Sequence, residues 1–359
     1  MYQNTIGKNN PKIIVNTRFL TQSITGVQRF AIEISRELKK YFGNDIAFVG
    51  PYNIINEEIV NELEVIRTGK HSGHIWEQIE LPRYLNRHGK PLLVCLCNTA
   101  PIFYRHKIST VHDVAFITFP QTFSKSFLLF YRIIIPLVLK TSKKVVTVSN
   151  FSKCELQNYY HISADQIYVI YNAVDKSFKK VDDENLKKTP YFLAVSSVNY
   201  RKNFLAVLQA FQLLPNKDLM LYVVGDLKNN SFKGIDIQQY KCDTRIKFLG
   251  RVSDDELIRL YSNAVGFIYP SLYEGFGIPP IEAQMCGCPV LSSDIPVLKE
   301  VLQDSAYYCN PYDINDISEK MQQLCRDNHV IIMAGYENVK RFSWKQSSKI
   351  LANVIKREL

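Results

Sequence analysis

Apolar and polar positions along the chain follow two alternating patterns, one of short buried runs and one of amphipathic stretches. In the first half, the apolar runs predict strands at residues 11–17, 45–50, 91–98, 108–114, 143–149 and 166–174. Residues 25–42 carry apolar side chains at helical spacing, which predicts an amphipathic helix. Residues 150–160 predict another helix, with Ser149 or Asn150 as its N-cap.

The second half repeats the alternation after a polar segment, residues 175–190, that lacks core residues. Strands are predicted at 190–197, 218–226, 246–252, 264–271 and 288–293, and helices at 203–214, 253–264, 279–287 and in a final stretch. Apolar strands separated by helices indicate parallel sheets with both faces covered. The chain is therefore predicted to form two doubly wound α/β domains, 1–173 and 174–342, with a ligand site in the cleft between them.

The composition is that of a globular protein. The chain has 359 residues, of which 46% are hydrophobic and 22% charged, and Gly and Pro number 15 each. These values exclude a disordered or collagen-like chain. No apolar run reaches the roughly 18–20 residues of a membrane-spanning helix, and the opening residues 1–12 have no apolar core of the kind that a secretory signal needs. We therefore expect a cytoplasmic protein.

The eight cysteines are scattered without the dense spacing of a disulfide framework, which agrees with a cytoplasmic location. Cys95 and Cys97 fall in the apolar run 91–98, where strand alternation would place both on one face. Neither Cys-x-Cys pair is joined to a histidine at zinc-finger spacing, so buried thiols are predicted rather than zinc ligands.

The charge is uneven along the chain. The formal net charge is +10, with a surplus of eight basic residues in 1–173 and of only two in 174–359. This surplus favours an anionic partner such as a lipid headgroup or a phosphorylated substrate, but no Lys/Arg-rich run indicates nucleic-acid binding. Residues 124–144 are mostly apolar and flanked by lysines, which fits either a core helix or a helix on an anionic membrane surface.

The most informative segment is residues 269–293, in which an apolar strand leads into the loop EGFGIPP. Pro280 suits the first turn of a following helix, and the loop amides with the helix start predict an anion site. Glu274 in the loop and Glu282 in the expected first turn have seven residues between them. Such carboxylates suit sugar hydroxyls; the alternatives are a solvated loop acid for Glu274 and a helix-dipole partner for Glu282.

This segment resembles the signature of glycosyltransferase family 4, which comprises retaining enzymes of the GT-B architecture. The resemblance extends through Ala283, Gly287, Pro289 and Val290, and the segment looks most like bacterial mannosyltransferases that build O-antigen and capsule chains. It implies two Rossmann-like domains whose parallel sheets face a central cleft, with 1–173 on the acceptor side and 174–342 binding the nucleotide sugar. It also implies a closing helix, 343–359, that packs back on the first domain.

Further segments resemble the family at matching positions. Residues 195–203 resemble its phosphate-binding segment, with Arg201 and Lys202 as the cations and Ser196 where a glycine is frequent. Residues 23–30 resemble the loop that approaches the donor phosphates, where Gly26 lets the backbone come close. Many relatives have a second glycine at the position of Thr25.

Two more segments carry residues that the resemblance connects with the sugar and the base. His112 matches the histidine that faces the transferred sugar. Residues 74–82 are similar to the mannosyltransferase subgroup, although Trp76 and Glu77 there could equally serve packing and capping. Residues 248–257 are expected to line the nucleobase pocket, through Gly250, Arg251 and Val252.

The resemblance implies a retaining transferase that takes a sugar, with GDP-mannose preferred, from a nucleotide diphosphate to a glycan or lipid-linked acceptor at the inner membrane face. Glu282 would hold the ribose and Glu274 the sugar, within a donor site that also includes Gly275, Phe276, Gly277 and Ile278. No D-x-D occurs in the sequence, so no metal or other cofactor is expected, and Arg201 and Lys202 would neutralise the leaving diphosphate.

Two other functions remain open at this point. The chain could be a non-catalytic subunit that binds a nucleotide sugar, or a GT-B enzyme that isomerises such a sugar or transfers to phosphate. A nicotinamide dehydrogenase is disfavoured because no G-x-G-x-x-G follows the first strand.

Overall fold

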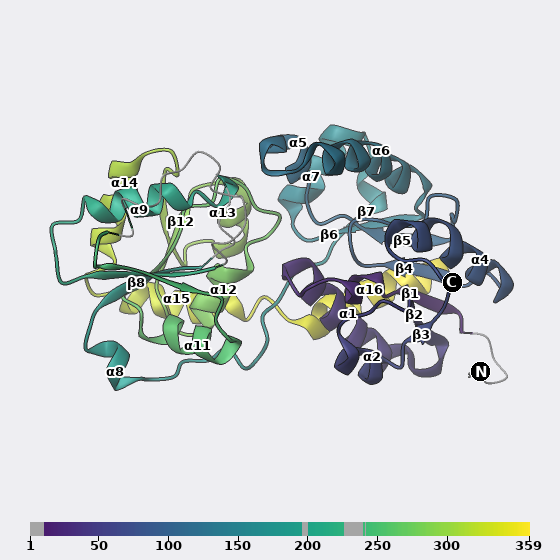
Figure 1. Ribbon diagram of the computed structural model, residues 1–359, viewed down its shortest axis with the longest axis horizontal. Helices are drawn as coiled ribbons and strands as arrows, with labels where there is room; N and C mark the ends of the chain where they lie inside the picture. Colours follow the sequence, from purple (N-terminus) through teal and green to yellow (C-terminus); the bar gives the residue numbers. More distant parts are fainter. Residues whose placement is uncertain (1–10, 196–199, 226–239, 241) are drawn as a thin grey trace. The chain divides into compact units, whose positions relative to one another are not determined.

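The computed structural model describes residues 11–195, 200–225, 240 and 242–359, and it divides into two compact units (Figure 1). Unit 1 contains the chain up to Val114, then Ser124–Asn172 and Ser343–Leu359, and unit 2 contains Ala115–Phe123 and Ala173–Phe342. The expected domain boundary after residue 173 differs from this division by one residue and does not anticipate the assignment of 115–123 to unit 2. The opening residues 1–10 and Ser196 lie outside the described residues.

The sheet of unit 1 has seven parallel strands in the order β3-β2-β1-β4-β5-β6-β7. Its strands are β1 (Ile13–Asn16), β2 (Ile46–Gly50), β3 (Ile66–Arg67), β4 (Leu92–Cys95), β5 (Lys107–Thr110), β6 (Lys144–Thr147) and β7 (Ile167–Val169). The central strand β1 is buried along its whole length and pairs with β2 and β4. Burial on both faces explains why these strands read as continuous apolar runs.

Helices cover both faces of this sheet, with α1, α2 and α16 on one side and α6 and α7 on the other (Figure 1). The helices are α1 (Gly26–Phe42), α2 (Glu57–Leu63), α3 (Gly73–Ile75), α4 (Leu81–Arg87), α6 (Lys125–Thr141), α7 (Asn150–Tyr160) and α16 (Trp344–Glu358), with a π-helical turn, η3 (Trp76–Glu80), and short 3-10 turns η1 (Arg18–Thr21), η2 (Gly43–Asp45) and η5 (Ala164–Gln166). Ser149 caps α7, accepting a hydrogen bond from the Ser152 backbone at 3.0 Å, which confirms one of the two predicted caps.

The helix α16 belongs to unit 1 although all of unit 2 precedes it in the chain. It packs on α1, and the ring of Trp344 meets that of Phe30 edge-on at 6.1 Å. The Ser347 hydroxyl donates to the Tyr171 carbonyl at 2.7 Å. Apolar burial and these contacts hold the helix against the first half of the chain.

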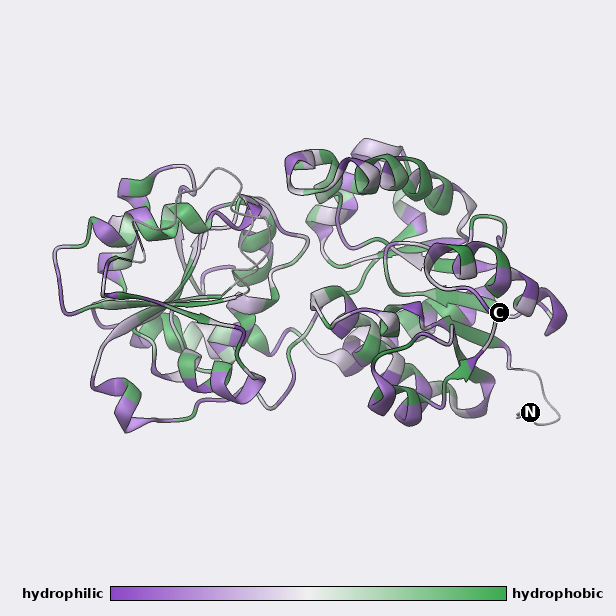
Figure 2. Ribbon diagram, in the orientation of Figure 1, coloured by the Kyte–Doolittle hydropathy of each residue, from purple (hydrophilic) through white to green (hydrophobic). Residues whose placement is uncertain are grey.

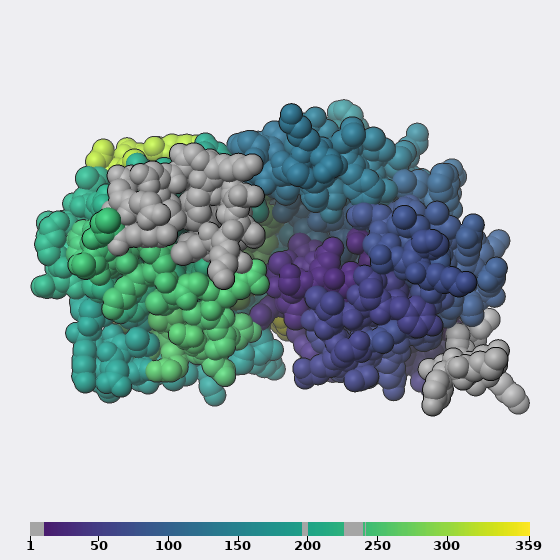
Figure 3. All heavy atoms as spheres, viewed as in Figure 1, coloured from purple at the N-terminus to yellow at the C-terminus, as the bar shows by residue number. Residues whose placement is uncertain are grey.

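The helix α6 is apolar on more than one side and lies on the outside of unit 1 (Figures 2 and 3). Ile134, Ile135, Val138 and Leu139 are buried in the core. Leu129 and Ile133, four residues apart, are 65% and 56% exposed. The segment predicted as either a core helix or a surface helix therefore contributes one face to the core and leaves another in contact with solvent.

The sheet of unit 2 has six parallel strands in the order β10-β9-β8-β11-β12-β13. Its strands are β8 (Tyr191–Val195), β9 (Met220–Val224), β10 (Ile246–Gly250), β11 (Gly266–Tyr269), β12 (Val290–Ser293) and β13 (Tyr307–Cys309). The helices α9 (Phe204–Gln212) and α14 (Ile314–Gln323) pack together, as do α12 (Ile278–Met285), α11 (Asp254–Asn263) and α15 (His329–Val339), and these two groups lie on opposite faces of the sheet (Figure 1).

Among the described residues of unit 2, the other elements are short: α5 (Ala115–Thr118), η4 (Pro120–Thr122), α8 (Glu184–Lys187), η6 (Tyr200–Lys202) and α13 (Pro296–Leu302). With two doubly wound parallel sheets, the structure confirms the predicted α/β class. No helix among the described residues is long and apolar enough to cross a bilayer.

The expectation for the first cysteine pair is partly wrong. Strand β4 ends at Cys95, so Cys97 follows the strand and does not share its face. Cys95 is buried and Cys97 is partly exposed, and both thiols are free. No group of His, Cys, Asp and Glu within the described ranges is placed to hold a metal ion.

Candidate functional site

Glu274 is the centre of a hydrogen-bonded cluster at the carboxyl end of the unit 2 sheet. It follows β11 in a buried loop. Its Oε1 accepts hydrogen bonds from the Tyr269 hydroxyl and the Ser271 hydroxyl, both at 2.6 Å, and from Lys202 Nζ at 2.5 Å. A carboxylate with this many donors is held in one orientation, so the alternative of a solvated loop acid is wrong.

The two cations of this cluster come from η6, which follows β8, the neighbour of β11 in the sheet. Arg201 Nη1 lies 3.4 Å from Glu274 Oε2 and donates to the Tyr273 carbonyl at 3.0 Å. Lys202 Nζ also donates to the Tyr269 hydroxyl at 3.0 Å. The structure thus brings together three predicted site residues, and we call Glu274, Arg201, Lys202, Tyr269 and Ser271 the Glu274 cluster.

The charges of the Glu274 cluster favour ionised side chains at neutral pH. Burial by itself would raise the pKa of Glu274, but Lys202 and Arg201 outweigh burial and lower it to about 2. Burial, together with the Glu274 charge, raises the pKa of Tyr269 well above its ordinary value, so its hydroxyl stays protonated as a donor. Two cations and one carboxylate leave the cluster with one net positive charge.

The helix after this loop begins earlier than predicted. Its first residue is Ile278, two positions before Pro280, and its N-cap is Gly277 with φ +100°. The left-handed backbone at Gly277 favours glycine, and a Cβ there would lie 2.6 Å from Leu298 Cδ2, so that the leucine side chain would have to shift. Because Pro279 and Pro280 have no N–H, the predicted amide-rich helix start offers only the amides of Gly277 and Ile278.

Glu282 lies in the second turn of α12 and not in the first, so its interpretation as a first-turn dipole partner is wrong. It is buried, and its Oε2 accepts a hydrogen bond from the Tyr261 hydroxyl at 3.3 Å. After burial itself, the Glu282 charge is the largest cause that raises the pKa of Tyr261. The Glu282 charge is also the smallest of the causes that shift the pKa of Tyr269 upward.

The other residues of unit 2 that were predicted to bind the donor lie at the same edge of the sheet or beside it. Gly250 ends β10 at an irregularity in the register, with φ +71°, and its carbonyl accepts from Gly225 at 2.8 Å. Arg251 is exposed and Val252 partly exposed immediately after it. Their role at a nucleobase stays a prediction.

The loop between Glu274 and α12 is packed into unit 2. Gly275 and Phe276 are both buried. The Phe276 ring meets the Phe342 ring edge-on at 5.4 Å. This packing fixes the backbone on which the predicted contacts of Gly275 and Phe276 to the donor depend.

In unit 1, His112 follows β5 and is buried. Its Nε2 lies 2.9 Å from the Leu96 carbonyl; since a carbonyl only accepts, Nε2 carries the proton and Nδ1 is the acceptor of the ring. Burial lowers the pKa of His112 below 6.5, so the ring is neutral at pH 7. The His112 backbone N–H donates to Asn98 Oδ1 at 2.9 Å.

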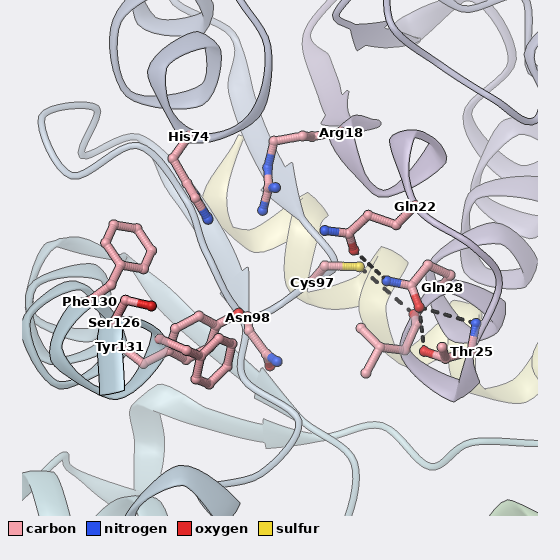
Figure 4. A pocket seen from close by; sticks show the side chains of 12 residues that line it. Arg18, Gln22, Thr25, Gln28, His74, Cys97, Asn98, Ser126, Phe130 and Tyr131 are labelled. Carbon is pink, nitrogen blue, oxygen red and sulfur yellow. Dashed lines mark hydrogen bonds between the residues drawn. The ribbon is translucent and has the colours of Figure 1, made fainter. Parts of the chain in front are cut away.

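A cavity of about 500 Å³ opens within unit 1 beside these groups (Figure 4). Gly26 is the first residue of α1 and lies between Thr25 and Val27, which both line the cavity. Asn98, another lining residue, is hydrogen-bonded to the backbone of His112. The Thr25 N–H donates to the Gln28 side chain at 3.2 Å, which caps α1 at the cavity wall. The lining residues are Arg18, Gln22, Thr25, Val27, Gln28, His74, Cys97, Asn98, Ser126, Phe127, Phe130 and Tyr131.

Sequence reasoning missed Arg18, which lines this cavity and pairs with Glu77. The Arg18 Nε lies 3.1 Å from Glu77 Oε1, to which Asn16 Nδ2 also donates at 2.7 Å. Thr99 Oγ1 donates to Glu77 Oε2 at 2.7 Å, and His74 Nδ1 lies 3.4 Å from the same oxygen. We call these five residues the Glu77 cluster.

Glu77 therefore has a role beyond the capping considered from the sequence. Its side chain is 1% exposed; burial would raise its pKa, but Arg18 and the hydrogen bonds lower it to about 2. Trp76 beside it is fully buried and donates to the Thr68 carbonyl at 2.8 Å, in keeping with the packing alternative. In the sequence, Arg18 is only an arginine two residues after the central strand β1, which by itself does not point to a site.

Comparisons with known proteins cover nearly the whole chain. Residues 175–342 match the family model described as "Glycosyl transferases group 1", and residues 24–178 match "Glycosyltransferase Family 4". The chain is 33% identical over 282 residues to the O-antigen chain mannosyltransferase RfbU of Salmonella typhimurium, covering 74% of this chain and 77% of that one. It is 29% identical over 268 residues to O-antigen chain mannosyltransferase B of Escherichia coli, covering 69% and 70%.

Solved structures share the fold at lower identity. Sucrose-phosphate synthase from Thermosynechococcus elongatus superposes with a TM-score of 0.75 at 17% identity, covering 97% of this chain and 99% of that one. Anabaena HepE in complex with UDP and glucose gives a TM-score of 0.74 at 16% identity, covering 96% and 99%.

Proposed function

The chain belongs to the glycosyltransferases of group 1 and family 4 and has their GT-B fold, and from this premise we propose that it transfers mannose from GDP-mannose to a glycan or lipid-linked acceptor. The transfer retains the anomeric configuration and needs no metal ion. The observation that carries the proposal is the Glu274 cluster, whose net positive charge lies at the carboxyl end of the sheet, where ligands of such sheets bind.

The choice of donor rests on the relatives. RfbU and mannosyltransferase B are named for mannosyl transfer to O-antigen chains. The HepE structure holds UDP and glucose, which supports a nucleotide sugar as the class of donor. Mannose and guanosine are the finer part of the proposal and require a direct test.

In the proposed mechanism, the bond between the sugar C1 and the diphosphate oxygen breaks while a bond forms from C1 to an acceptor hydroxyl on the same face. The hydroxyl proton passes to the departing phosphate, so no protein general base is assigned. Arg201 and Lys202 stabilise the negative charge that develops on the diphosphate. Glu274 holds both cations in place before the donor binds.

The remaining groups orient the donor. Glu282 accepts hydrogen bonds from the ribose, and Glu274 with the Phe276 and Gly277 amides positions the sugar. His112, neutral and with Nδ1 as acceptor, contacts a sugar hydroxyl and helps to steady the positive charge that forms at C1. Metal independence is supported by the two cations and by the absence of D-x-D from the sequence.

The proposal is tested with purified protein and GDP-mannose or UDP-glucose, by donor hydrolysis and by transfer to an extract of lipid-linked glycans. Lys202→Ala and Glu274→Ala should each abolish most turnover, and an excess of EDTA should leave wild-type turnover unchanged. Lys247→Ala is the matched control, since Lys247 is an exposed lysine 5.7 Å from the Tyr222 ring centroid in the same sheet. Wild-type turnover in the Lys202 and Glu274 variants would overturn the site, and donor binding without turnover would favour the non-catalytic alternative.

We also propose that unit 1 contacts an anionic membrane surface through α6. The exposed residues Leu129, Ile133 and Leu137 are spaced four apart along this helix, and Lys125 and Lys140 lie near its ends. Apolar side chains would enter the headgroup region while the lysines meet anionic lipid. Co-flotation with phosphatidylglycerol vesicles should be lost in Leu129→Glu/Ile133→Glu; equal flotation of variant and wild type would contradict the contact.

A further inference from the structure

The walls of the unit 1 cavity combine planar polar side chains with aromatic rings (Figure 4). Arg18, Gln22, Gln28 and Asn98 offer guanidinium and amide groups, which can engage neighbouring hydroxyls in pairs. Phe127, Phe130 and Tyr131 come from α6 and present rings to the cavity. This combination suits a sugar, which has hydroxyls at its edge and C–H groups on its faces, and about 500 Å³ is within the usual range for small-ligand sites.

The Arg18 guanidinium is fixed but not saturated. Its Nε is held by Glu77 and its Nη2 donates to Thr99 Oγ1 at 2.7 Å. Among the residues that the structure describes, none accepts a hydrogen bond from its Nη1, and the side chain lines the cavity. Arg18 therefore has N–H donors available to a ligand in an orientation that Glu77 sets.

The charge of Arg18 is balanced before any ligand arrives. Burial disfavours the charged guanidinium, but Glu77 reverses the effect and raises the pKa of Arg18. Burial raises the pKa values of Tyr131 and Cys97 to about 12, so neither adds charge at neutral pH. His74, which also lines the cavity, has its Nδ1 3.4 Å from Glu77 Oε2. The wall thus offers donors without the net positive charge of the Glu274 cluster.

We propose that this cavity binds a neutral sugar unit of the acceptor. Arg18 recognises the hydroxyls of that sugar, and Glu77 is the positioning residue that orients Arg18 and neutralises its charge. This inference rests on the proposed function, since it specifies the second substrate of the same transferase. A phosphorylated or carboxylated sugar would have to lie beside Glu77 without an uncompensated cation to bind it.

The first test measures binding and needs no turnover. Methyl α-D-mannopyranoside, methyl β-D-galactopyranoside and methyl 2-acetamido-2-deoxy-β-D-glucopyranoside are titrated into the full chain to about 10 mM, where a millimolar site is mostly occupied, and followed by saturation-transfer NMR. At least one should bind. Arg18→Lys keeps the positive charge beside Glu77 but loses the fork of donors, and should weaken that binding about tenfold or more.

A matched substitution controls for general effects on unit 1. Arg36 forms a two-pronged ion pair with Glu62 on the surface of α1. Arg36→Lys removes the same fork away from the cavity and should leave glycoside binding unchanged. Equal binding in Arg18→Lys and wild type, or no binding of any neutral glycoside, would overturn the proposal.

The second test separates positioning from a merely structural role through selectivity. In Glu77→Gln the side chain keeps its shape but Arg18 is no longer neutralised. The ratio of affinities for mannose 6-phosphate over methyl α-D-mannopyranoside should therefore rise at least tenfold over wild type, in protein shown to be folded by circular dichroism. An unchanged ratio would overturn the role of Glu77, and a wild-type preference for mannose 6-phosphate would overturn the neutral-sugar assignment. Sugar transfer by wild type despite either result would leave the proposed function intact.

Discussion

The Glu274 cluster of unit 2 and the Glu77 cluster of unit 1 are built on the same principle and differ in charge. Each has a buried carboxylate whose pKa lies at about 2 and which accepts hydrogen bonds from cationic and neutral donors. Glu274 faces two cations, Lys202 and Arg201, whereas Glu77 faces Arg18 with a histidine nearby. One additional cation distinguishes a site that favours an anion from a neutral hydrogen-bonding site, in keeping with the diphosphate proposed for unit 2 and the neutral sugar proposed for unit 1.

The largest expected effect comes from removing each carboxylate charge in turn. Glu274→Gln should lower kcat with GDP-mannose about 100- to 1000-fold, because the cations that stabilise the leaving diphosphate lose their anchor. Glu77→Gln should leave kcat within about threefold and act on the acceptor KM. Steady-state kinetics with both substrates varied measures this difference. If both variants changed kcat and the acceptor KM in the same way, the proposed difference between the two clusters would be contradicted.

The second expected effect is on acid stability. The folded pKa values of Glu274 and Glu77, at about 2, lie below their ordinary 4.5, so the stability they contribute is present above about pH 4.5 and is lost as the pH falls toward 2. Each Gln variant should lose on the order of 2–3 kcal/mol at pH 7 and depend less on pH below 4.5. Urea unfolding at several pH values measures both quantities.

The two units can be followed separately in that experiment, because the two tryptophans of the chain, Trp76 and Trp344, both lie in unit 1. Burial lowers the pKa of His112 below 6.5, so unit 1 should begin to lose stability once the pH falls below about 6.5. As the pH is lowered, tryptophan fluorescence, which follows unit 1, should therefore show a loss of stability at a higher pH than circular dichroism, which follows both units. Coincident transitions at every pH would contradict the difference between the units.

Salt should distinguish the two sites more modestly. Raising NaCl from about 0.05 to 0.5 M shortens the screening length about threefold. GDP-mannose binding should weaken about three- to tenfold, because it depends on the net positive charge of the Glu274 cluster. Methyl glycoside binding in unit 1 should change less than twofold. Calorimetric titrations in both salts provide the measurement, and equal salt dependence would count against the charge difference.

The smallest expected effects come from single hydroxyl donors. Tyr269→Phe removes one donor to Glu274, and Thr99→Val removes one donor to Glu77. Each should cost about 1 kcal/mol of unfolding free energy, the usual value of one hydrogen bond. Thermal unfolding of both variants beside wild type checks the equivalence, and a loss confined to one variant would show that the clusters are not built alike.

The sequence predicts the fold and the unit 2 cluster well because their signals are local. The buried parallel strands appear as apolar runs, and Glu274 lies five residues after Tyr269, the last residue of β11. The short edge strands β3 and β13 were not predicted, whereas the similarly short β7 was predicted because it lies in the longer apolar run 166–174. The helix start at Ile278 was misplaced because the left-handed Gly277, and not the prolines, ends the loop.

The unit 1 cluster was only partly visible for a different reason. Arg18 and Glu77 are 59 residues apart, and the fold alone brings them together. No local pattern marks Arg18 as the partner, since a single arginine after a strand is ordinary in a globular protein. Residues 74–82 resemble the mannosyltransferase subgroup, but the role of Glu77 depends on a contact that only tertiary structure supplies.

The placement of α16 has a consequence for how the chain matures on the ribosome. Residues up to 172 emerge with the surface of α1 still lacking Trp344 and the helix that follows it, while 173–342 can already collapse. At ordinary translation speeds the delay is roughly 10–30 s. Unit 1 is thus synthesised first and completed last, and the apolar side chains of α1 that α16 covers in the finished protein are where nascent-chain chaperones would be expected to act.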